Sequence, residues 1–368
     1  MGTKGPGVYV TDDLGSTNWE WDLRSEGLRG ITPWDVAAEP GNPQYAYVVT
    51  DGSGNFRSVD GGESWEAVEI GEWSFGTTVA IANTVPTATV YVGLPNAVAV
   101  STDRGESWTE YPIPASGNNH VEALVAHPVT ATLLYAGLWE TVSNTGSVWR
   151  SEDGGQTWSA LPITATGSIS RVEAVAALTD GTLLVGTGGQ GIYRSADGGQ
   201  TWTPSNNGLP NLWVNHLHVS GDVVWAALDD GVASSDDGGQ TWTKRGLDGI
   251  RVRRVAVDPQ NPQVIYAASP ESGLYVSYDR GETWQADAGG LGGVPVMAVD
   301  AASDGSQAYV YAAVRGGFAS AGGAARERRG LAARQGSEAA DEVYVSAGVY
   351  QKVNRWSWVY LPVVMKGR

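Results

Sequence analysis

The sequence predicts an all-β protein, a single seven-bladed β-propeller of four-stranded antiparallel blades. Three observations support this: a turn motif that repeats along the chain, its nearly constant spacing, and three further short apolar segments in each period. The motif, Ser-x-Asp-x-Gly-x-Ser/Thr-Trp, occurs six times, with its aspartates at Asp60, Asp103, Asp153, Asp197, Asp237 and Asp279. Successive aspartates are 40 to 50 residues apart, about the length that a blade of four short strands requires.

The array of motifs extends toward the N-terminus through an imperfect copy. This copy runs from Thr11 to Trp19, carries Asp13 at the aspartate position and has one extra residue before its tryptophan. Asp and Ser side chains bond neighbouring backbone amides and Gly tolerates positive φ, so each motif predicts a rigid hairpin turn. The tryptophan that ends each motif starts the next strand and is expected to pack between blades. In the intact copies these are Trp65, Trp108, Trp158, Trp202, Trp242 and Trp284.

The other strands of a period are clearest around residue 260. Three apolar segments, Val252–Val257, Val264–Ala268 and Gly273–Ser277, lead into the motif, and Trp284 opens a fourth strand after it. The turn residues between the first two segments are those expected between short antiparallel strands. The other periods show the same order, which gives seven first strands and therefore seven blades.

The two ends of the chain compete to close the ring. The segments Gly7–Val10 and Trp19–Leu23 are expected to complete the last blade and so remove free sheet edges. A C-terminal strand pair and tail, residues 343–368, could take that place instead, so six or eight blades remain alternatives. We assign residues 1–314 to the propeller and residues 315–342 to an insertion rich in Ala, Gly, Arg and Glu.

Composition argues against several classes of function. The formal net charge of −17, with no basic cluster before residue 315, argues against nucleic acid as a partner. The chain has no cysteine, and His216 and His218 lack an identifiable third ligand, so no metal site is expected. P-loop and Rossmann glycine patterns are absent, and no cofactor is expected. The apolar tract Trp358–Met365 is too short to span a bilayer, and residues 1–12 contain no apolar run typical of a signal peptide.

The repeated motif resembles the Asp-box, or BNR, repeats of sialidases, endoxyloglucanases, the sortilin luminal domain and photosystem II assembly factors. The resemblance covers roughly residues 7–314 and implies a β-propeller. It implies no activity, because enzymes and non-enzymatic binding proteins share this repeat. The Arg-Ile-Pro signature of sialidases is absent. Endoxyloglucanases of this class place catalytic carboxylates on two propellers that flank a cleft, whereas this chain supplies a single propeller.

A binding site is expected on the rim opposite the Asp boxes, where the loops from fourth to first strand and from second to third strand meet. Aligning the first strands places Trp34, Thr78, Glu122, Glu173, Asn215, Arg253 and Pro295 at one equivalent position. A structural position in a repeat should itself repeat, so this mixture of charges and indoles is typical of a polar ligand site. Solvated charges at a channel mouth are the alternative. The predicted ligand-binding residues are Trp34, Trp73, His120, Trp139, Arg171, Trp213, Arg251 and Arg253.

Three hypotheses for the function follow. The first is a non-catalytic binding or scaffolding propeller, secreted or at the cell surface, that engages a glycan or a protein through this rim. The second is a glycoside hydrolase in which Glu122 and Glu173, on neighbouring blades, form the acid and base pair. The third is a structural protein that self-assembles into a surface layer or filament through the strand pair at residues 343–362. The acidic charge, the indole-rich loops and the missing catalytic motifs favour the first.

Overall fold

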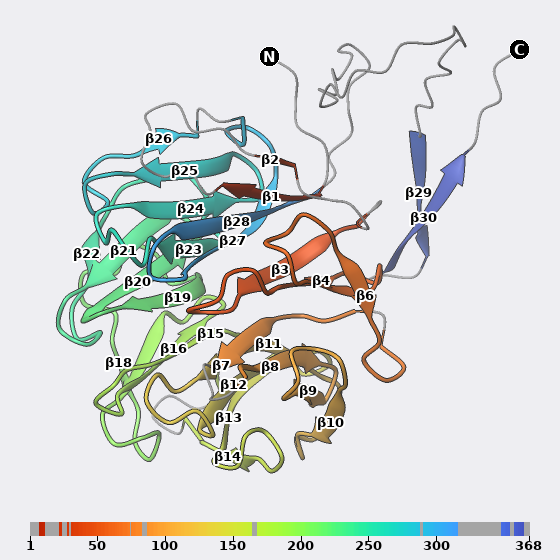
Figure 1. Cartoon of the computed structure of the whole chain (residues 1–368). Coiled ribbons are helices and arrows are strands. Elements are labelled where there is room, and N and C mark those ends of the chain that lie inside the picture. The colour runs from red at the N-terminus through yellow and green to blue at the C-terminus, as the bar shows by residue number, and fades with distance from the viewer. Residues whose placement is uncertain are drawn as a thin grey trace, which may run out of the picture. The chain divides into compact units, whose positions relative to one another are not determined.

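The computed structural model consists of two compact units, Met1–Ala324 and Ala325–Arg368. The structure describes residues 7–11, 22–23, 28, 31–73, 75–82, 87–163, 168–287, 290–315, 347–353 and 357–363. All regular secondary structure in these residues consists of antiparallel strands (Figure 1). Among them, no helix has the length and hydropathy needed to cross a membrane.

Six four-stranded sheets of the first unit each use four consecutive strands. The first two sheets are β3 (Pro33–Ala38), β4 (Ala46–Thr50), β5 (Asn55–Ser58) and β6 (Glu66–Val68), then β7 (Val79–Ala82), β8 (Thr89–Leu94), β9 (Ala97–Ser101) and β10 (Thr109–Pro112). The next two are β11 (Asn119–Ala126), β12 (Leu134–Glu140), β13 (Thr145–Ser151) and β14 (Ser159–Ala160), then β15 (Val172–Ala177), β16 (Leu183–Thr187), β17 (Ile192–Ser195) and β18 (Thr203–Pro204). The last two are β19 (Val214–Ser220), β20 (Val223–Leu228), β21 (Gly231–Ser235) and β22 (Thr243–Lys244), then β23 (Arg254–Val257), β24 (Ile265–Ser269), β25 (Gly273–Ser277) and β26 (Gln285–Ala286).

A further four-stranded sheet joins the two ends of the propeller unit. Its order is β27 (Val296–Ser303), β28 (Ala308–Val314), β1 (Gly7–Thr11) and β2 (Asp22–Leu23). The first strands of successive sheets contact one another from β3 to β27, and β27 contacts β3. The prediction of an all-β propeller with four-stranded antiparallel blades is therefore confirmed. The N-terminal strands complete the last blade, as expected for Gly7–Val10.

The C-terminal strand pair forms a sheet of its own. In the second unit, β29 (Ala347–Val353) pairs with β30 (Ser357–Val363). In the propeller unit, β28 has β27 on one side and β1 on the other, so both of its edges are paired. The predicted insertion at 315–342 lies outside the described residues except for Arg315, and so does Asp13 of the imperfect box.

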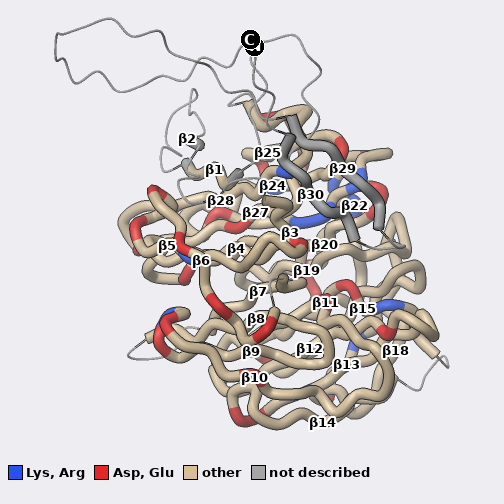
Figure 2. Tube along the Cα trace, turned by 90° about the vertical axis from the view of Figure 1, so that its right-hand side faces the viewer, with Lys and Arg blue, Asp and Glu red and all other residues tan. Residues whose placement is uncertain are grey.

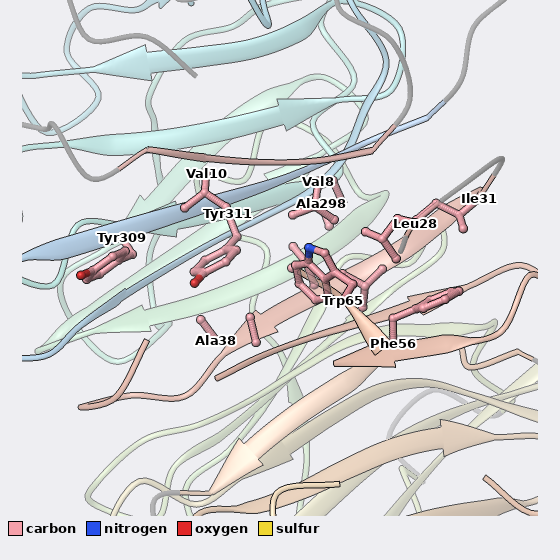
Figure 3. Close-up of a cluster of buried hydrophobic side chains, with 14 of the residues drawn as sticks. Val8, Val10, Leu28, Ile31, Ala38, Phe56, Trp65, Ala298, Tyr309 and Tyr311 are labelled. Atoms are coloured by element: carbon pink, nitrogen blue, oxygen red, sulfur yellow. The ribbon is translucent and has the colours of Figure 1, made fainter. Parts of the chain in front are cut away.

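Buried apolar side chains fill the spaces between neighbouring sheets. One cluster, between the sheet that contains β1 and the sheet β3–β6, includes Val8, Val10, Trp65 and Tyr311 (Figure 3). Alternate residues of a strand lie on the same face, and accordingly Val8 and Val10 are both wholly buried. The hydroxyl of Tyr311 donates a hydrogen bond to the carbonyl of Pro43 in the neighbouring sheet. The N-terminal strand is thus part of the core.

The six intact Asp boxes adopt one hydrogen-bonded turn, illustrated by the box at Asp197. Ser195 Oγ accepts from the N–H of Gly199 at 2.8 Å and donates to Asp197 at 2.7 Å. Asp197 accepts the hydroxyl of Thr201 at 2.6 Å and its N–H at 2.9 Å, and these two bonds lower the pKa of Asp197 to about 2. The bonds recur in the other five boxes. The polar residues of the boxes are therefore engaged in the turn itself.

The tryptophans of the boxes pack against their own blades or neighbouring ones. Trp202 donates from Nε1 to the carbonyl of Gly199 in its own box, whereas Trp242 donates to Ser205 of the preceding blade. Trp65, Trp158, Trp202 and Trp242 are buried, and Trp108 and Trp284 are half-buried. The indole rings of the boxes thus serve the packing of the blades.

A β-bulge recurs near the start of five first strands. The pairing of β3, β11, β15, β19 and β27 skips one residue each, and the skipped residues are Trp34, Glu122, Glu173, Asn215 and Met297. A bulge turns the side chain of its extra residue away from the regular alternation. The predicted alignment of first strands is correct at Trp34, Glu122, Glu173 and Asn215. In the last blade the equivalent residue is Met297 rather than Pro295, because Pro295 lies before the strand begins.

Candidate functional site

Arg171 links two carboxylates where the first strands β11 and β15 begin. Its Nη2 lies 2.9 Å from Oε2 of Glu122, and its Nε lies 2.8 Å from Oε1 of Glu173. The bulges in β11 and β15 present these two glutamates, while Arg171 directly precedes β15. The two carboxylates predicted from the alignment therefore lie together, and they share one guanidinium.

Aromatic rings flank this ion-pair cluster. The guanidinium of Arg171 lies over the ring of Trp139, with Cζ 4.5 Å from the ring centroid. The ring centroids of His120 and Trp139 are 6.0 Å apart. These two residues lie opposite each other in the pairing of β11 with β12. Trp139 Nε1 donates to Asn144 at 3.0 Å, which fixes the indole at the turn that follows β12. The indole thus provides a flat support for the cation.

A second guanidinium, that of Arg253, lies over the ring of Trp34 with Cζ 4.4 Å from the ring centroid. Its side chain forms no ion pair or hydrogen bond with the residues that the structure describes. Burial and the neighbouring charge of Arg254 lower the pKa of Arg253 to about 10, although Asp35, Glu122 and Glu173 oppose this shift. The side chain remains a cation at neutral pH.

The neighbouring arginines, in contrast, have carboxylate partners. Arg254 binds Asp35, which also accepts the hydroxyl of Thr78 at 3.0 Å. Arg251 Nε lies 3.0 Å from Oδ1 of Asp229, and Asn215 donates to the same oxygen at 2.9 Å. Arg253 is therefore the arginine in this group whose charge is free for a ligand.

Burial raises the pKa of Glu173 to about 7. The negative charge of Glu122 adds to this effect, whereas Arg171, Arg253 and Arg251 oppose it. Its side chain is 17% exposed, so the carboxylate is poorly hydrated in spite of its ion pair. Glu173 therefore exchanges a proton near neutral pH.

Trp213 and Trp73, the other two predicted rim tryptophans, lie in different surroundings. Trp213 is half exposed and lies against Gly188 and Gly189 of the preceding blade. Trp73 packs edge-on against Phe75 and donates to Glu110 of β10 at 3.3 Å. β10 is the outer strand of its sheet, so Trp73 lies away from the arginines.

The structure thus brings together most of the predicted ligand-binding residues. The assembled group is Trp34, His120, Glu122, Trp139, Arg171, Glu173, Arg251 and Arg253. Figure 2 shows a basic stretch beside β3 in a chain that carries 40 acidic and 23 basic residues. We name the four arginines of the site, Arg171, Arg251, Arg253 and Arg254, the arginine cluster.

Three members of the site were missed by sequence reasoning. Asp35, Asp229 and Arg254 are ion-paired within it, although strict alternation assigns Asp35 and Arg254 to the face opposite their neighbours. The bulge after Pro33 breaks that alternation in β3. The signal in the sequence is that Asp35 directly follows Trp34, the position at which the aligned first strands differ from blade to blade.

His216 and His218 lie on β19 with their rings 6.3 Å apart. Burial lowers the pKa of His218 to about 4 and that of His216 well below its ordinary value. His216 Nδ1 accepts the N–H of Val255 at 3.4 Å. In the part of the chain that the structure describes, no group of three or more His, Cys, Asp or Glu is arranged to hold a metal ion.

A family of propeller proteins matches most of this sequence. The family model described as photosynthesis system II assembly factor YCF48 matches residues 15–294. No curated protein matches the chain. Among solved structures, YCF48 from Cyanidioschyzon merolae is 18% identical with a TM-score of 0.55, over 77% of this chain and 94% of that chain. A structure of YCF48 bound to D1 peptide is 17% identical with a TM-score of 0.59, over 87% of this chain and 100% of that chain.

Enzymes with the same repeat share the fold as well. An ancestral GH74 enzyme is 21% identical with a TM-score of 0.56, over 74% of this chain and 40% of that chain. At such identities, likeness to a solved structure shows the fold alone. The family model, in contrast, spans well over half of the sequence and confirms the resemblance to photosystem II assembly factors. The chain therefore belongs to the family of the photosynthesis system II assembly factor YCF48.

Proposed function

We propose that this chain is a non-catalytic, seven-bladed propeller that binds a carboxylate-bearing segment of a partner protein on the rim opposite the Asp boxes. The observation that carries the proposal is Arg253, which stacks on Trp34 and has no ion-pair partner among the described residues. A guanidinium held in a fixed position suits a carboxylate, which accepts two parallel hydrogen bonds from it. The stacked indole keeps the cation in place before the partner arrives.

The charge distribution of the chain supports a localised acidic ligand. With a formal net charge of −17, most of the surface repels an acidic segment. At the proposed site Arg253 keeps a positive charge with no carboxylate partner among the described residues, whereas Arg171, Arg251 and Arg254 are bound to carboxylates. Attraction by Arg253 and repulsion by the rest of the surface together direct such a segment to it. The Ser, Asp and Thr side chains of the Asp boxes, in contrast, bond within their own turns.

The family supports a protein as the partner. The chain belongs to the YCF48 family, and one similar structure is that of YCF48 bound to D1 peptide. We therefore propose the D1 peptide of photosystem II, or a segment like it, as the partner. A neutral glycan would use the indoles without needing the charge of Arg253, so the effect of this residue on binding separates the two ligand classes. A secreted or cell-surface location stays a prediction.

The arrangement of Glu122 and Glu173 favours binding over hydrolysis. Both carboxylates contact Arg171, whereas a glycoside hydrolase needs its two carboxylates to face the scissile bond from opposite sides. The raised pKa of Glu173 suits a general acid, and the hydrolase hypothesis stays a prediction.

Binding of labelled D1 peptide, measured by fluorescence anisotropy at fixed salt, tests the proposed function. Arg253→Ala should weaken binding about tenfold to a hundredfold, since a hydrogen bond to a charged group contributes about 1.5–3 kcal/mol. Arg280→Ala is the matched control, because Arg280 is an exposed arginine in an Asp-box turn of the opposite rim. Its affinity should equal that of the wild type.

A second probe isolates the carboxylate. The same peptide with its carboxyl groups amidated should bind the wild type no better than the parent peptide binds Arg253→Ala. Equal affinities of Arg253→Ala and Arg280→Ala for the parent peptide would contradict the proposed site. Circular dichroism of both variants establishes that each retains the wild-type fold.

A further inference from the structure

Two large apolar residues lie side by side on the rim of the proposed site. Leu212 is 43% exposed and Trp213 is 51% exposed, and both directly precede β19. The other large apolar side chains with high exposure in the described residues, Val59, Val129, Val142 and Tyr278, are isolated along the chain. We name Leu212 and Trp213 the apolar shelf. An exposed indole beside a second apolar side chain is typical of a surface that binds a partner.

The backbone holds the apolar shelf in a fixed position. The carbonyl of Leu212 accepts the N–H groups of Gly189 and Gly191 at 3.2 and 2.8 Å. A Cβ built on Gly189 would lie 3.2 Å from Nε1 of Trp213, so the indole lies directly on the glycine backbone. Gly189 has a φ of 107°, which other residues rarely adopt. One face of the indole is thus supported, and half of the side chain stays exposed.

The apolar shelf is continuous with the charged residues of the site. A Cβ built on Gly188 would lie 3.3 Å from Cζ3 of Trp213 and 3.7 Å from Oε1 of Glu173, so this glycine lies between the two side chains. The N–H of Asp229 donates to the carbonyl of Trp213 at 3.2 Å, and Asp229 is the partner of Arg251. A bound segment can therefore contact both regions within a few residues.

We propose that the apolar shelf binds an apolar side chain of the same partner segment whose carboxylate contacts Arg253. This inference rests on the proposed function and specifies the ligand further: a carboxylate with an apolar residue a few positions away. The charged contact aligns the segment, and burial of the apolar side chain against Trp213 adds affinity that an acidic residue alone would lack.

A hollow on the blade β11–β14 is the competing place for such a side chain. It has a volume of about 560 Å³, and its lining includes Asn118, Glu140, Val142 and Ser147. The carboxylate of Glu140 accepts the N–H groups of Val142 and Ser143, and the hydroxyl of Ser143 and these amides lower its pKa to about 2. This negative charge repels an acidic segment, whereas the carboxylates beside the apolar shelf, those of Glu173 and Asp229, are paired with Arg171 and Arg251. Charge complementarity therefore favours the shelf.

A double-mutant cycle with D1 peptide tests the inference. Each apolar residue of the peptide is replaced by alanine in turn, and each peptide is titrated against wild type and Trp213→Ala by fluorescence anisotropy. We expect Trp213→Ala to weaken binding of the parent peptide about tenfold. One of the alanine peptides should bind wild type and Trp213→Ala with nearly equal affinity, because its alanine and the Trp213→Ala change remove the same contact. Val129→Ala, a 71% exposed apolar residue in the turn on the Asp-box side, should bind like the wild type.

The outcomes separate this inference from the proposed function. If Arg253→Ala weakens binding but Trp213→Ala stays within twofold of the wild type, the apolar shelf is refuted and the proposed function stands. A loss of affinity in Val142→Ala, with none in Trp213→Ala, places the side chain in the hollow and also refutes the shelf. If the D1 peptide does not bind the wild type, or binds Arg253→Ala equally well, both proposals fail.

Discussion

Deletion of residues 1–23 is expected to destabilise the propeller by about 5 kcal/mol or more, a large part of the stability of a typical domain. The deletion removes β1 and β2 and leaves β28 with an unpaired edge from Val310 to Val314. It also removes Val8 and Val10 from the cluster that contains Trp65 and Tyr311. Burial of each valine contributes about 1.5–3 kcal/mol, and the lost strand pairing adds to this. Thermal unfolding followed by circular dichroism measures the effect.

Deletion of residues 325–368 is the matched control for shortening the chain. These residues form the second unit, and neither edge of β28 pairs with them. We expect the thermal midpoint of the propeller to stay within a few degrees of the wild type. The reverse result, with a stable protein after the N-terminal deletion and an unstable one after the C-terminal deletion, would show that the C-terminal strand pair closes the ring.

Replacement of Glu173 by glutamine is expected to remove a pH-dependent loss of stability. The pKa of Glu173 is about 7 in the folded protein and 4.5 in an ordinary glutamate. Between these values the folded protein keeps a proton that the unfolded chain has released, so a rise in pH favours unfolding. Below pH 4.5 both states are protonated, and above pH 7 both are ionised. The wild type therefore loses up to about 3 kcal/mol of stability across this window through Glu173.

The measurement compares free energies of urea unfolding at pH 5 and pH 8. Relative to the wild type, Glu173→Gln should be more stable at pH 8 than at pH 5 by up to about 3 kcal/mol. Asp300, whose burial raises its pKa to about 6, contributes a similar slope in both proteins and cancels in the comparison. Glu140→Gln is the control, because the pKa of Glu140 is about 2 and its ionisation is complete at both pH values. A parallel pH dependence of Glu173→Gln and wild type would refute the assigned proton.

The sequence predicts the blades because the residues of the Asp box act locally. In each box Ser, Asp, Gly and Thr or Ser form a turn whose bonds stay within about five residues, so the same turn forms wherever the motif occurs. The first strands could be aligned for a similar reason, since their apolar centres repeat. That alignment placed Glu122 and Glu173 correctly, because each lies in a bulge at the same position of its blade.

The partners of these side chains could not be predicted, because they depend on neighbours that are distant in the sequence. Arg254 binds Asp35 across 219 residues, and Arg253 lies over the ring of Trp34, the residue before Asp35 in β3. The surroundings of Trp73 could not be predicted either. Its position in a rim loop suggested a ligand contact, and in the structure its ring packs against Phe75 and donates a hydrogen bond to Glu110. Position in a rim loop does not show whether an indole faces the centre of the propeller or its outer edge.

Hydrogen–deuterium exchange with and without D1 peptide tests most directly that function lies on the rim opposite the Asp boxes. We expect slower exchange on peptide addition at residues 119–122, 171–173, 188–191 and 251–254, which carry or support the arginine cluster and the apolar shelf. We expect no change in the Asp-box turns, such as residues 195–201 and 235–241. Protection confined to those turns, with none around Arg171 and Arg253, would contradict it.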